Sequence, residues 1–277
     1  MNILCDIGGT KMRIATENGG VLGDVNIIST PSTYVGSLEA LKDNFSSTEK
    51  IDKVIVGIAG VVSADKKTIV SGPNLLDWVG KDIALDLSEI FGGGEVVLQN
   101  DTALVGLGEA LEGAGKGFEI VTYITVSTGV GGVRIVNGVI DKSRYGFEPG
   151  HQIIDVDGTQ CPECNTLSHE GLGHLDNMIS GRALFEKAGK NPKDVSDSDV
   201  WNSHARYLAV GLYNTILHWS PDVVVLGGSM ITGDPAINIE KVTKNLTELM
   251  HAFPEIPVIK MAELGDKGGL IGGSSFV

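Results

Sequence analysis

Two glycine-rich stretches of the sequence have the residue types and spacing that a phosphate-binding turn requires. The first, DIGGTKMRIA, covers residues 6–15, and the second, STGVGGVRIV, covers residues 127–136. Such turns present backbone N–H groups to phosphate oxygens, and glycine lets the backbone approach a bulky anion. A glycine-rich hairpin turn without a ligand is the alternative explanation for either stretch taken alone. Their occurrence at matching places favours two turns that together bind the phosphates of a nucleotide.

The elements that must position these turns follow the same order in two parts of the chain. The first part has patterns typical of a β-meander and then of helices and strands, at 3–7, 12–16, 21–28, 33–45, 54–58, 95–98 and 102–111. The second part repeats this order, at 120–126, 132–136, 139–140, 176–188, 199–219, 223–226, 236–251 and 258–261. A β-meander followed by α/β units, occurring twice, predicts two similar halves with a cleft between them. We expect an N-terminal lobe over 1–115 and a C-terminal lobe over 116–277.

The composition limits the partners that the protein can bind. The chain has 277 residues and a net charge of −14, with only 21 lysines and arginines. No large basic face can be built from this balance, which argues against nucleic acid and anionic membranes as partners. No run approaches the roughly 18 apolar residues of a membrane span, and we expect no signal peptide at Met1. The three cysteines do not form a disulfide framework. We therefore expect a cytoplasmic protein that binds small molecules.

Further motifs follow in an order that resembles one known family. They are VGIAGVV (56–62), GPNLLDW (72–78), QNDTALVGLGEA (99–110), GFEPGH (146–151), ISGRAL (179–184), VVVLGGS (223–229) and GDKGGLIGGS (265–274). Together with the two glycine-rich stretches and a cysteine-containing stretch at 161–164, they make the chain resemble the sugar kinases of the ROK family (repressor, open reading frame, kinase). The resemblance covers nearly the whole chain. It implies an α/β, two-lobed, actin-like or ribonuclease H-like ATPase fold with an interlobe cleft, and a homodimer.

The resemblance implies that three glycine-rich turns hold ATP. The residues implied in nucleotide binding are Asp6, Gly8, Gly9, Thr10, Lys11, Thr128, Gly129, Gly227, Gly228 and Ser229. Asp6 would hold Mg²⁺ or its water shell, because Mg²⁺ prefers a few carboxylate oxygens together with phosphates. The alternative for Asp6 is an Asx turn. Lys11 would offset phosphate charge, and its alternative is a solvated side chain.

Asp101 is the residue that we expect to act as catalytic base. Phosphoryl transfer to a hydroxyl requires a base aligned with the attacking oxygen, and a carboxylate can accept that proton. Asn100 and Asp101 follow a strand and open a helix, so an ordinary N-cap pair is the alternative explanation. The resemblance also implies a sugar site, because sugar hydroxyls are best bound by carboxylates and amides. The implied sugar-binding residues are Asn74, Asn100, Asp101, Glu148, His151 and Asp176.

The sequence departs from the family at its zinc site. The family carries a histidine followed by C-x-C-G-x-x-G-C-x-E, whereas Cys161 and Cys164 form a C-x-x-C that no third cysteine follows. Counting back from Ser180 puts the third cysteine position on His174 and the glutamate position on Asp176. Counting forward from Cys164 reaches His169 instead. We expect structural Zn²⁺ on His151, Cys161, Cys164 and His174, because histidine and cysteine are both zinc ligands. His169 in place of His174, or loss of the metal, remains an alternative.

The resemblance implies an ATP-dependent kinase that phosphorylates a hydroxyl of a hexose or an N-acetylhexosamine, at O6. Glucose is the simplest acceptor, and mannose, fructose, allose and N-acetylhexosamines are alternatives. A second hypothesis is a sugar-responsive transcription regulator, since the family contains such proteins with a helix-turn-helix domain at the N-terminus. A third is a sugar-binding sensor with weak catalytic activity. The intact Asp6, Asp101 and glycine-rich turns favour the kinase.

Overall fold

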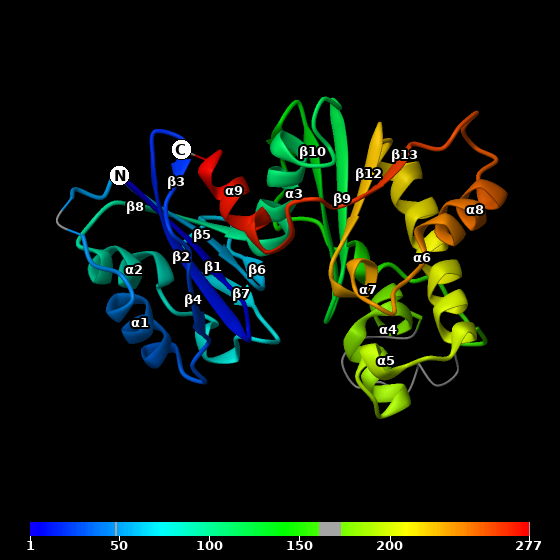
Figure 1. Cartoon of the computed structure of the whole chain (residues 1–277), viewed down its shortest axis with the longest axis horizontal. Helices are drawn as coiled ribbons and strands as arrows, with labels where there is room; N and C mark the ends of the chain where they lie inside the picture. The colour runs from blue at the N-terminus through cyan, green and yellow to red at the C-terminus, as the bar shows by residue number, and fades with distance from the viewer. Residues whose placement is uncertain (48, 161–172, 277) are drawn as a thin grey trace. The chain divides into compact units, whose positions relative to one another are not determined.

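The structure is a computed structural model that describes residues 1–47, 49–160 and 173–276, and it divides the chain into two units. Unit 1 consists of Met1–Glu112, Lys142–Gly146 and Leu264–Val277, and unit 2 of Gly113–Asp141 and Phe147–Glu263. Each unit contains its own sheet and its own helices (Figure 1). This division differs from the expected boundary at 115 and 116, because the segment that starts at Leu264 packs with the first part of the chain.

The sheet of unit 1 has the strand order β3-β2-β1-β5-β8, with β4 paired to β2. Its strands are β1 (Asn2–Ile7), β2 (Lys11–Asn18), β3 (Val21–Leu22), β4 (Asn26–Ser29), β5 (Lys53–Ile58) and β8 (Glu95–Asn100). The first strands form the predicted antiparallel meander, and β1, β5 and β8 are parallel neighbours. A short hairpin of β6 (Val61–Val62) and β7 (Ile69–Ser71), followed by the 3₁₀ turn η1 (Leu76–Trp78), joins β5 to the next helix.

Helices cover both faces of this sheet. Alternate residues of a strand point to opposite faces, and β1 shows this alternation in its packing. Ile3 and Cys5 pack with α1 (Tyr34–Asp43) and α2 (Ile83–Phe91), whereas Leu4 packs with α3 (Asp101–Glu112) and α9 (Gly268–Ser274). The central strands are therefore buried on both sides, which explains their nearly continuous apolar sequences.

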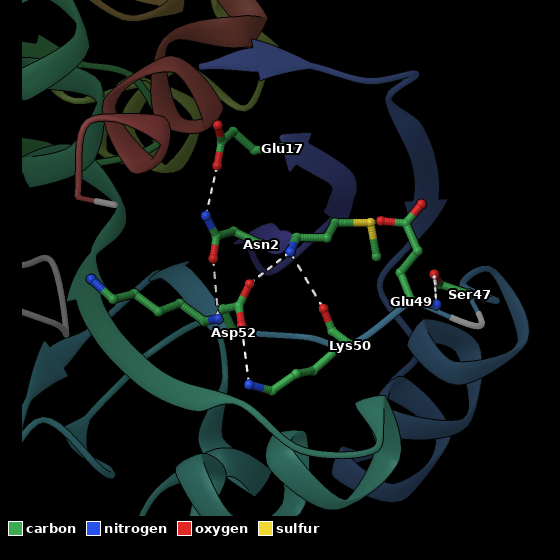
Figure 2. A network of polar contacts seen from close by, with 8 residues as sticks. Asn2, Glu17, Ser47, Glu49, Lys50 and Asp52 are labelled. Atoms are coloured by element: carbon green, nitrogen blue, oxygen red, sulfur yellow. Dashed lines mark hydrogen bonds and ion pairs between the residues drawn. The ribbon is translucent and has the colours of Figure 1, made fainter. Parts of the chain in front are cut away.

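A buried polar contact fixes β1 between its two neighbours at the end far from the glycine-rich turn. The Asn2 amide donates to Glu17 at 2.7 Å and its oxygen accepts from the Lys53 N–H at 3.1 Å. Glu17 is only 1% exposed, and the Gly20 N–H donates to its other oxygen. Figure 2 shows Asn2 next to Glu17 in this network. Because the contact ties β1 to β2 and β5, it sets the strand register that carries Asp6 to the opposite end.

The sheet of unit 2 repeats the topology of the first, in the order β11-β10-β9-β12-β13. Its strands are β9 (Ile120–Val126), β10 (Val130–Val136), β11 (Val139–Ile140), β12 (Val223–Gly227) and β13 (Val258–Met261). In both sheets an antiparallel hairpin precedes two parallel strands. This repeat confirms the two similar halves and the fold class expected from the sequence.

Several helices in the described part of unit 2 contribute residues to its main core. They are α4 (Leu175–Ile179), α5 (Gly181–Ala188), α6 (Ser198–Trp219), α7 (Ser229–Thr232) and α8 (Ile239–Leu249). The single helix expected over 176–188 is broken at Ser180, whose backbone is extended and whose hydroxyl caps α5 by accepting from the Ala183 N–H. No helix in the described ranges combines the length and the apolar character needed to cross a membrane.

Candidate active site

The first glycine-rich turn connects β1 to β2 at the carboxyl edge of the sheet in unit 1. The Gly8 N–H donates to the Lys11 carbonyl at 3.0 Å, and the Thr30 hydroxyl donates to the Gly8 carbonyl at 2.7 Å. A Cβ added to Gly9 would lie 2.7 Å from the Cβ of Asn74, so only glycine allows this approach. The turn is therefore packed against Asn74, which the sequence placed in the sugar site, while Gly9, Thr10 and Lys11 stay exposed.

Asp6, the second-last residue of β1, is held by an arginine on the neighbouring strand. Arg13 Nη1 lies 2.9 Å from Asp6 Oδ2, and Arg13 Nη2 lies 2.9 Å from Asp266 Oδ1. Burial raises the pKa of the Asp6 carboxyl above its usual value, and the Arg13 guanidinium opposes that rise. Asp6 is thus a paired carboxylate, and it forms no Asx-turn contact among the described hydrogen bonds.

Asp101 lies at the same sheet edge as Asp6, two strands away, with β5 between β1 and β8. In the parallel strands β1, β5 and β8, Asp6 is in register with Gly57 and Gly57 with Gln99, two residues before Asp101. The Gly57 position is close to α3, because a Cβ there would lie 3.5 Å from the Asp101 Cα. Parallel strands bring their carboxyl ends to one edge, which is where α/β sheets place ligands. The structure therefore places the two carboxylates that the sequence singled out in this unit on the same sheet edge.

Asn100 and Asp101 start α3 in different ways. Asn100 caps the helix, because its side-chain oxygen accepts from the Ala103 N–H at 3.1 Å, and its amide donates to the Gly60 carbonyl at 3.1 Å. Asp101 Oδ1 accepts from the Thr102 N–H at 2.7 Å. The N-cap alternative therefore describes Asn100. The half-buried Asp101 lies in the first turn, where the helix dipole stabilises a negative charge.

Close glycine contacts hold α3 against α9. A Cβ on Gly108 would lie 2.5 Å from the Gly268 carbonyl oxygen, and one on Gly272 would lie 1.8 Å from the Leu104 carbonyl oxygen. The buried Glu109 side chain also accepts from the Leu264 N–H at 2.8 Å. The segment that carries Asp266 thus supports the helix that begins with Asp101.

The second and third glycine-rich turns lie side by side in unit 2. Gly227 at the end of β12 is in register with Thr125 of β9, and the Ser127 and Ser229 hydroxyl oxygens are 3.2 Å apart. Gly228 has a φ of +88°, and a Cβ there would lie 2.3 Å from the Val126 carbonyl oxygen. Thr128 and Gly129 follow directly on Ser127. Within this unit the structure therefore gathers the five residues expected at the nucleotide: Thr128, Gly129, Gly227, Gly228 and Ser229.

Asp176, expected at the sugar, is instead buried beneath the second turn. It is 6% exposed, and its Oδ1 accepts from the Val130 N–H at 2.6 Å. Its Oδ2 forms an ion pair with Arg182. Arg182 belongs to the ISGRAL motif, yet sequence reasoning gave it no role, because its partner is set by the break between α4 and α5.

Glu148 precedes the short turn η2 (Pro149–His151) in unit 2, and His151 is its last residue. Both side chains are exposed, with 3.9 Å between His151 Nε2 and Glu148 Oε2. The turn is pressed onto β10, since a Cβ on Gly150 would lie 2.2 Å from the Val130 carbonyl oxygen. Gln152, which sequence reasoning missed, donates to the Pro149 carbonyl at 2.8 Å and accepts from Asn214 of α6 at 3.0 Å. In the sequence, the one indication of this role was that Gln152 is a polar residue directly after His151.

His151 and His174, two of the four expected zinc ligands, lie next to each other. Their ring centres are 5.7 Å apart, and an isolated antiparallel bridge pairs Ile153 with His174. Cys161, Cys164 and the alternative ligand His169 lie outside the described residues. Within the described ranges, no group of three or more histidine, cysteine, aspartate or glutamate side chains is arranged to hold a metal ion.

Comparison with known proteins identifies similar chains over almost the whole length. Residues 3–277 match the model of the ROK family. The chain is 28% identical to an N-acetyl-D-glucosamine kinase from Escherichia coli in an alignment of 301 positions that covers 96% of each chain. It is 26% identical to a glucokinase from Streptomyces coelicolor, covering 98% of this chain and 96% of that one. The crystal structure of a ROK hexokinase from Thermus thermophilus superposes with a TM-score of 0.82 at 26% identity, covering 98% of this chain and 96% of the other.

Proposed function

The chain belongs to the ROK family as a sugar kinase, and from this premise we propose that it transfers the terminal phosphoryl group of ATP to a hydroxyl of a hexose or an N-acetylhexosamine, at O6. The observation that carries this proposal is the sheet edge of unit 1, where Asp6, Asp101 and the turn at Gly8–Lys11 occur together. We also propose that the protein forms a homodimer, and this part of the proposal is based only on the family resemblance.

Asp101 is the proposed general base. The sugar hydroxyl oxygen forms a bond to the terminal phosphorus of ATP, its proton passes to the Asp101 carboxylate, and ADP leaves with the electrons of the broken P–O bond. The position of Asp101 in the first turn of α3, at the sheet edge that also carries Asp6, supports this role. The cap formed by Asn100 and the contact with Thr102 orient the carboxylate.

The proposed nucleotide site uses backbone N–H groups more than cations. Thr128, Gly129, Gly227, Gly228 and Ser229 would bind it in unit 2, and Gly8, Gly9, Thr10 and Lys11 in unit 1. Asp6 fits a Mg²⁺ site, because Mg²⁺ needs only one or two protein carboxylates besides phosphates and water, and the contact with Arg13 uses only the Asp6 Oδ2 atom. When bound, Mg²⁺ would neutralise part of the phosphate charge.

The proposed sugar site consists of Asn74, Asn100, Glu148 and His151 together with the base. Amide and carboxylate groups suit sugar hydroxyls, which both donate and accept hydrogen bonds. The packing of Gly9 against Asn74 supports this set, because it places a proposed sugar-binding residue next to the first phosphate turn. Asp176 is left out of this set because it is only 6% exposed and lies beneath the second turn.

We also propose a structural Zn²⁺ bound by His151, Cys161, Cys164 and His174. Two imidazoles that share one Zn²⁺ through bonds of about 2.0–2.1 Å place their ring centres about 5 Å apart, and the 5.7 Å separation here is close to that value. The histidine pair therefore fits a shared metal, and it favours His174 over His169. Such a closed site would hold the turn that carries Glu148 and His151.

Replacing His174 by alanine is expected to lower the zinc content of the purified protein. The wild type should carry about one Zn²⁺ per chain, and loss of one of four ligands weakens a structural site strongly. Zinc would be measured by plasma mass spectrometry after dialysis against a mild chelator. His251→Ala, an exposed histidine of the same unit, is the control and should keep the metal. A zinc content unchanged in His174→Ala would remove this residue from the ligand set.

Phosphorylation of a sugar panel tests the proposed function directly. The panel contains glucose, mannose, fructose, allose and N-acetylhexosamines, each with Mg-ATP, and ADP formation is followed by a coupled assay. We expect turnover of at least one of these sugars and a 6-phosphate product identified by NMR. Binding of a sugar without turnover, in protein shown to be folded, would instead support the sensor.

A further inference from the structure

Asp176 is a buried carboxylate that contacts both the second glycine-rich turn and the helix beside it. Its Oδ1 accepts from the N–H of Val130, the first residue after the turn, at 2.6 Å. A Cβ on Gly129 would come within 3.1 Å of this oxygen, so glycine makes room for it. Its Oδ2 pairs with Arg182, whose side chain is 23% exposed.

The turn is held from its other side by the backbone at the start of α5. The Gly181 N–H donates to the Ser127 carbonyl at 2.7 Å, and the Arg182 N–H donates to the Thr128 carbonyl at 3.1 Å. In a trans peptide the N–H points opposite to the C=O of the same peptide unit. With both carbonyls directed at α5, the N–H groups of Thr128 and Gly129 must point away from it.

We propose that Asp176 and Arg182 are positioning residues for the nucleotide: they fix the turn at Ser127–Gly129 so that the N–H groups of Thr128 and Gly129 face the phosphate oxygens. The inference rests on the proposed nucleotide site in unit 2. It makes Asp176 a residue that positions the turn and not a ligand of the sugar.

Two substitutions of Asp176 separate the two roles. Asp176→Asn keeps an oxygen for the Val130 N–H but loses the charge that pairs with Arg182. Asp176→Glu keeps the charge but adds a methylene to a buried site, which forces the turn to move. We expect each variant to bind Mg-AMP-PNP about tenfold more weakly by calorimetry, while the KM for the sugar changes less than about twofold.

Arg182→Gln provides an independent variant, because its partly exposed side chain is less critical for folding. It should weaken nucleotide binding in the same way, and adding it to Asp176→Asn should cause little further loss, because the two residues act as one pair. Asp194→Asn, an exposed acid of the same unit, is the matched control and should bind like the wild type.

The outcomes distinguish this inference from the proposed function. A rise in the sugar KM of Asp176→Asn with unchanged nucleotide affinity, or a fall in the sugar KM of Asp176→Glu, would make Asp176 a sugar ligand and overturn the inference alone. Unchanged nucleotide affinity in Asp176→Asn, Asp176→Glu and Arg182→Gln would also overturn the inference alone. Failure of the wild type to bind Mg-AMP-PNP would overturn the nucleotide site itself, and the inference with it.

Discussion

Replacing Asp101 by asparagine is expected to lower kcat for sugar phosphorylation by about 10²–10⁴-fold, the range that a positioned general base contributes. Asparagine has the same shape and can still accept from the Thr102 N–H, but its amide cannot take up the hydroxyl proton. The KM values for sugar and nucleotide should change much less than kcat, because the lost interaction belongs to the transition state. Steady-state kinetics on the sugar identified by the panel would measure both constants.

Asp82→Asn is the matched control for this experiment. Asp82 caps α2 in the same unit, where it accepts from the Leu85 N–H at 3.2 Å, and it is exposed. The same chemical change at a helix start should therefore leave kcat within about twofold of the wild type. If kcat of Asp101→Asn stayed within about tenfold of the wild type, the base would have to be another group.

Gly272→Ala is expected to destabilise the protein by about 3 kcal/mol or more. The new Cβ would lie 1.8 Å from the Leu104 carbonyl oxygen and 2.9 Å from the Gly108 nitrogen, both of which are backbone atoms of α3. Helix α9 would have to move away from α3, because helix backbone atoms cannot rotate out of the way as the end of a flexible side chain can. Urea unfolding followed by circular dichroism measures the loss of unfolding free energy.

Gly273→Ala makes the same change one residue further along α9. Its Cβ would meet Leu4 Cδ2 at 3.5 Å, which is ordinary contact, and alanine favours a helix over glycine by about 0.5–1 kcal/mol. This control should therefore be as stable as the wild type or slightly more so. Equal stability of the two variants would show that α3 and α9 are not packed as closely as described.

The sequence predicted the elements whose patterns are local. Both meanders, the parallel strands and the three glycine-rich turns follow from apolar runs and glycine spacing, and the repeated strand order confirms the duplicated fold. Helix α9 was not predicted, because a segment with glycine at 268, 269, 272 and 273 has a low helix propensity. It forms a helix because those glycines allow close packing against α3, which is a tertiary effect.

The candidate site was predicted in its residue types but only partly in its contacts. Asp6 and Asp101 lie on one sheet edge, as the parallel strands require. The partner of Asp6, Arg13, follows from hairpin pairing, since the two residues are opposite each other in β1 and β2. The place of Asp176 could not be predicted, because it depends on the break at Ser180 that lets Arg182 turn back toward it.

The packing of α9 in unit 1 determines the order in which the chain can complete its folding during synthesis. Leu270 of α9 packs with Leu4, Ile55 and Leu104. The ribosome makes these three residues before unit 2 and makes Leu270 after it. At about 5–20 residues per second, roughly 10–30 s pass between the end of α3 and the arrival of α9. Unit 2 can thus fold while unit 1 still exposes an apolar face, so the unit that is started first is finished last.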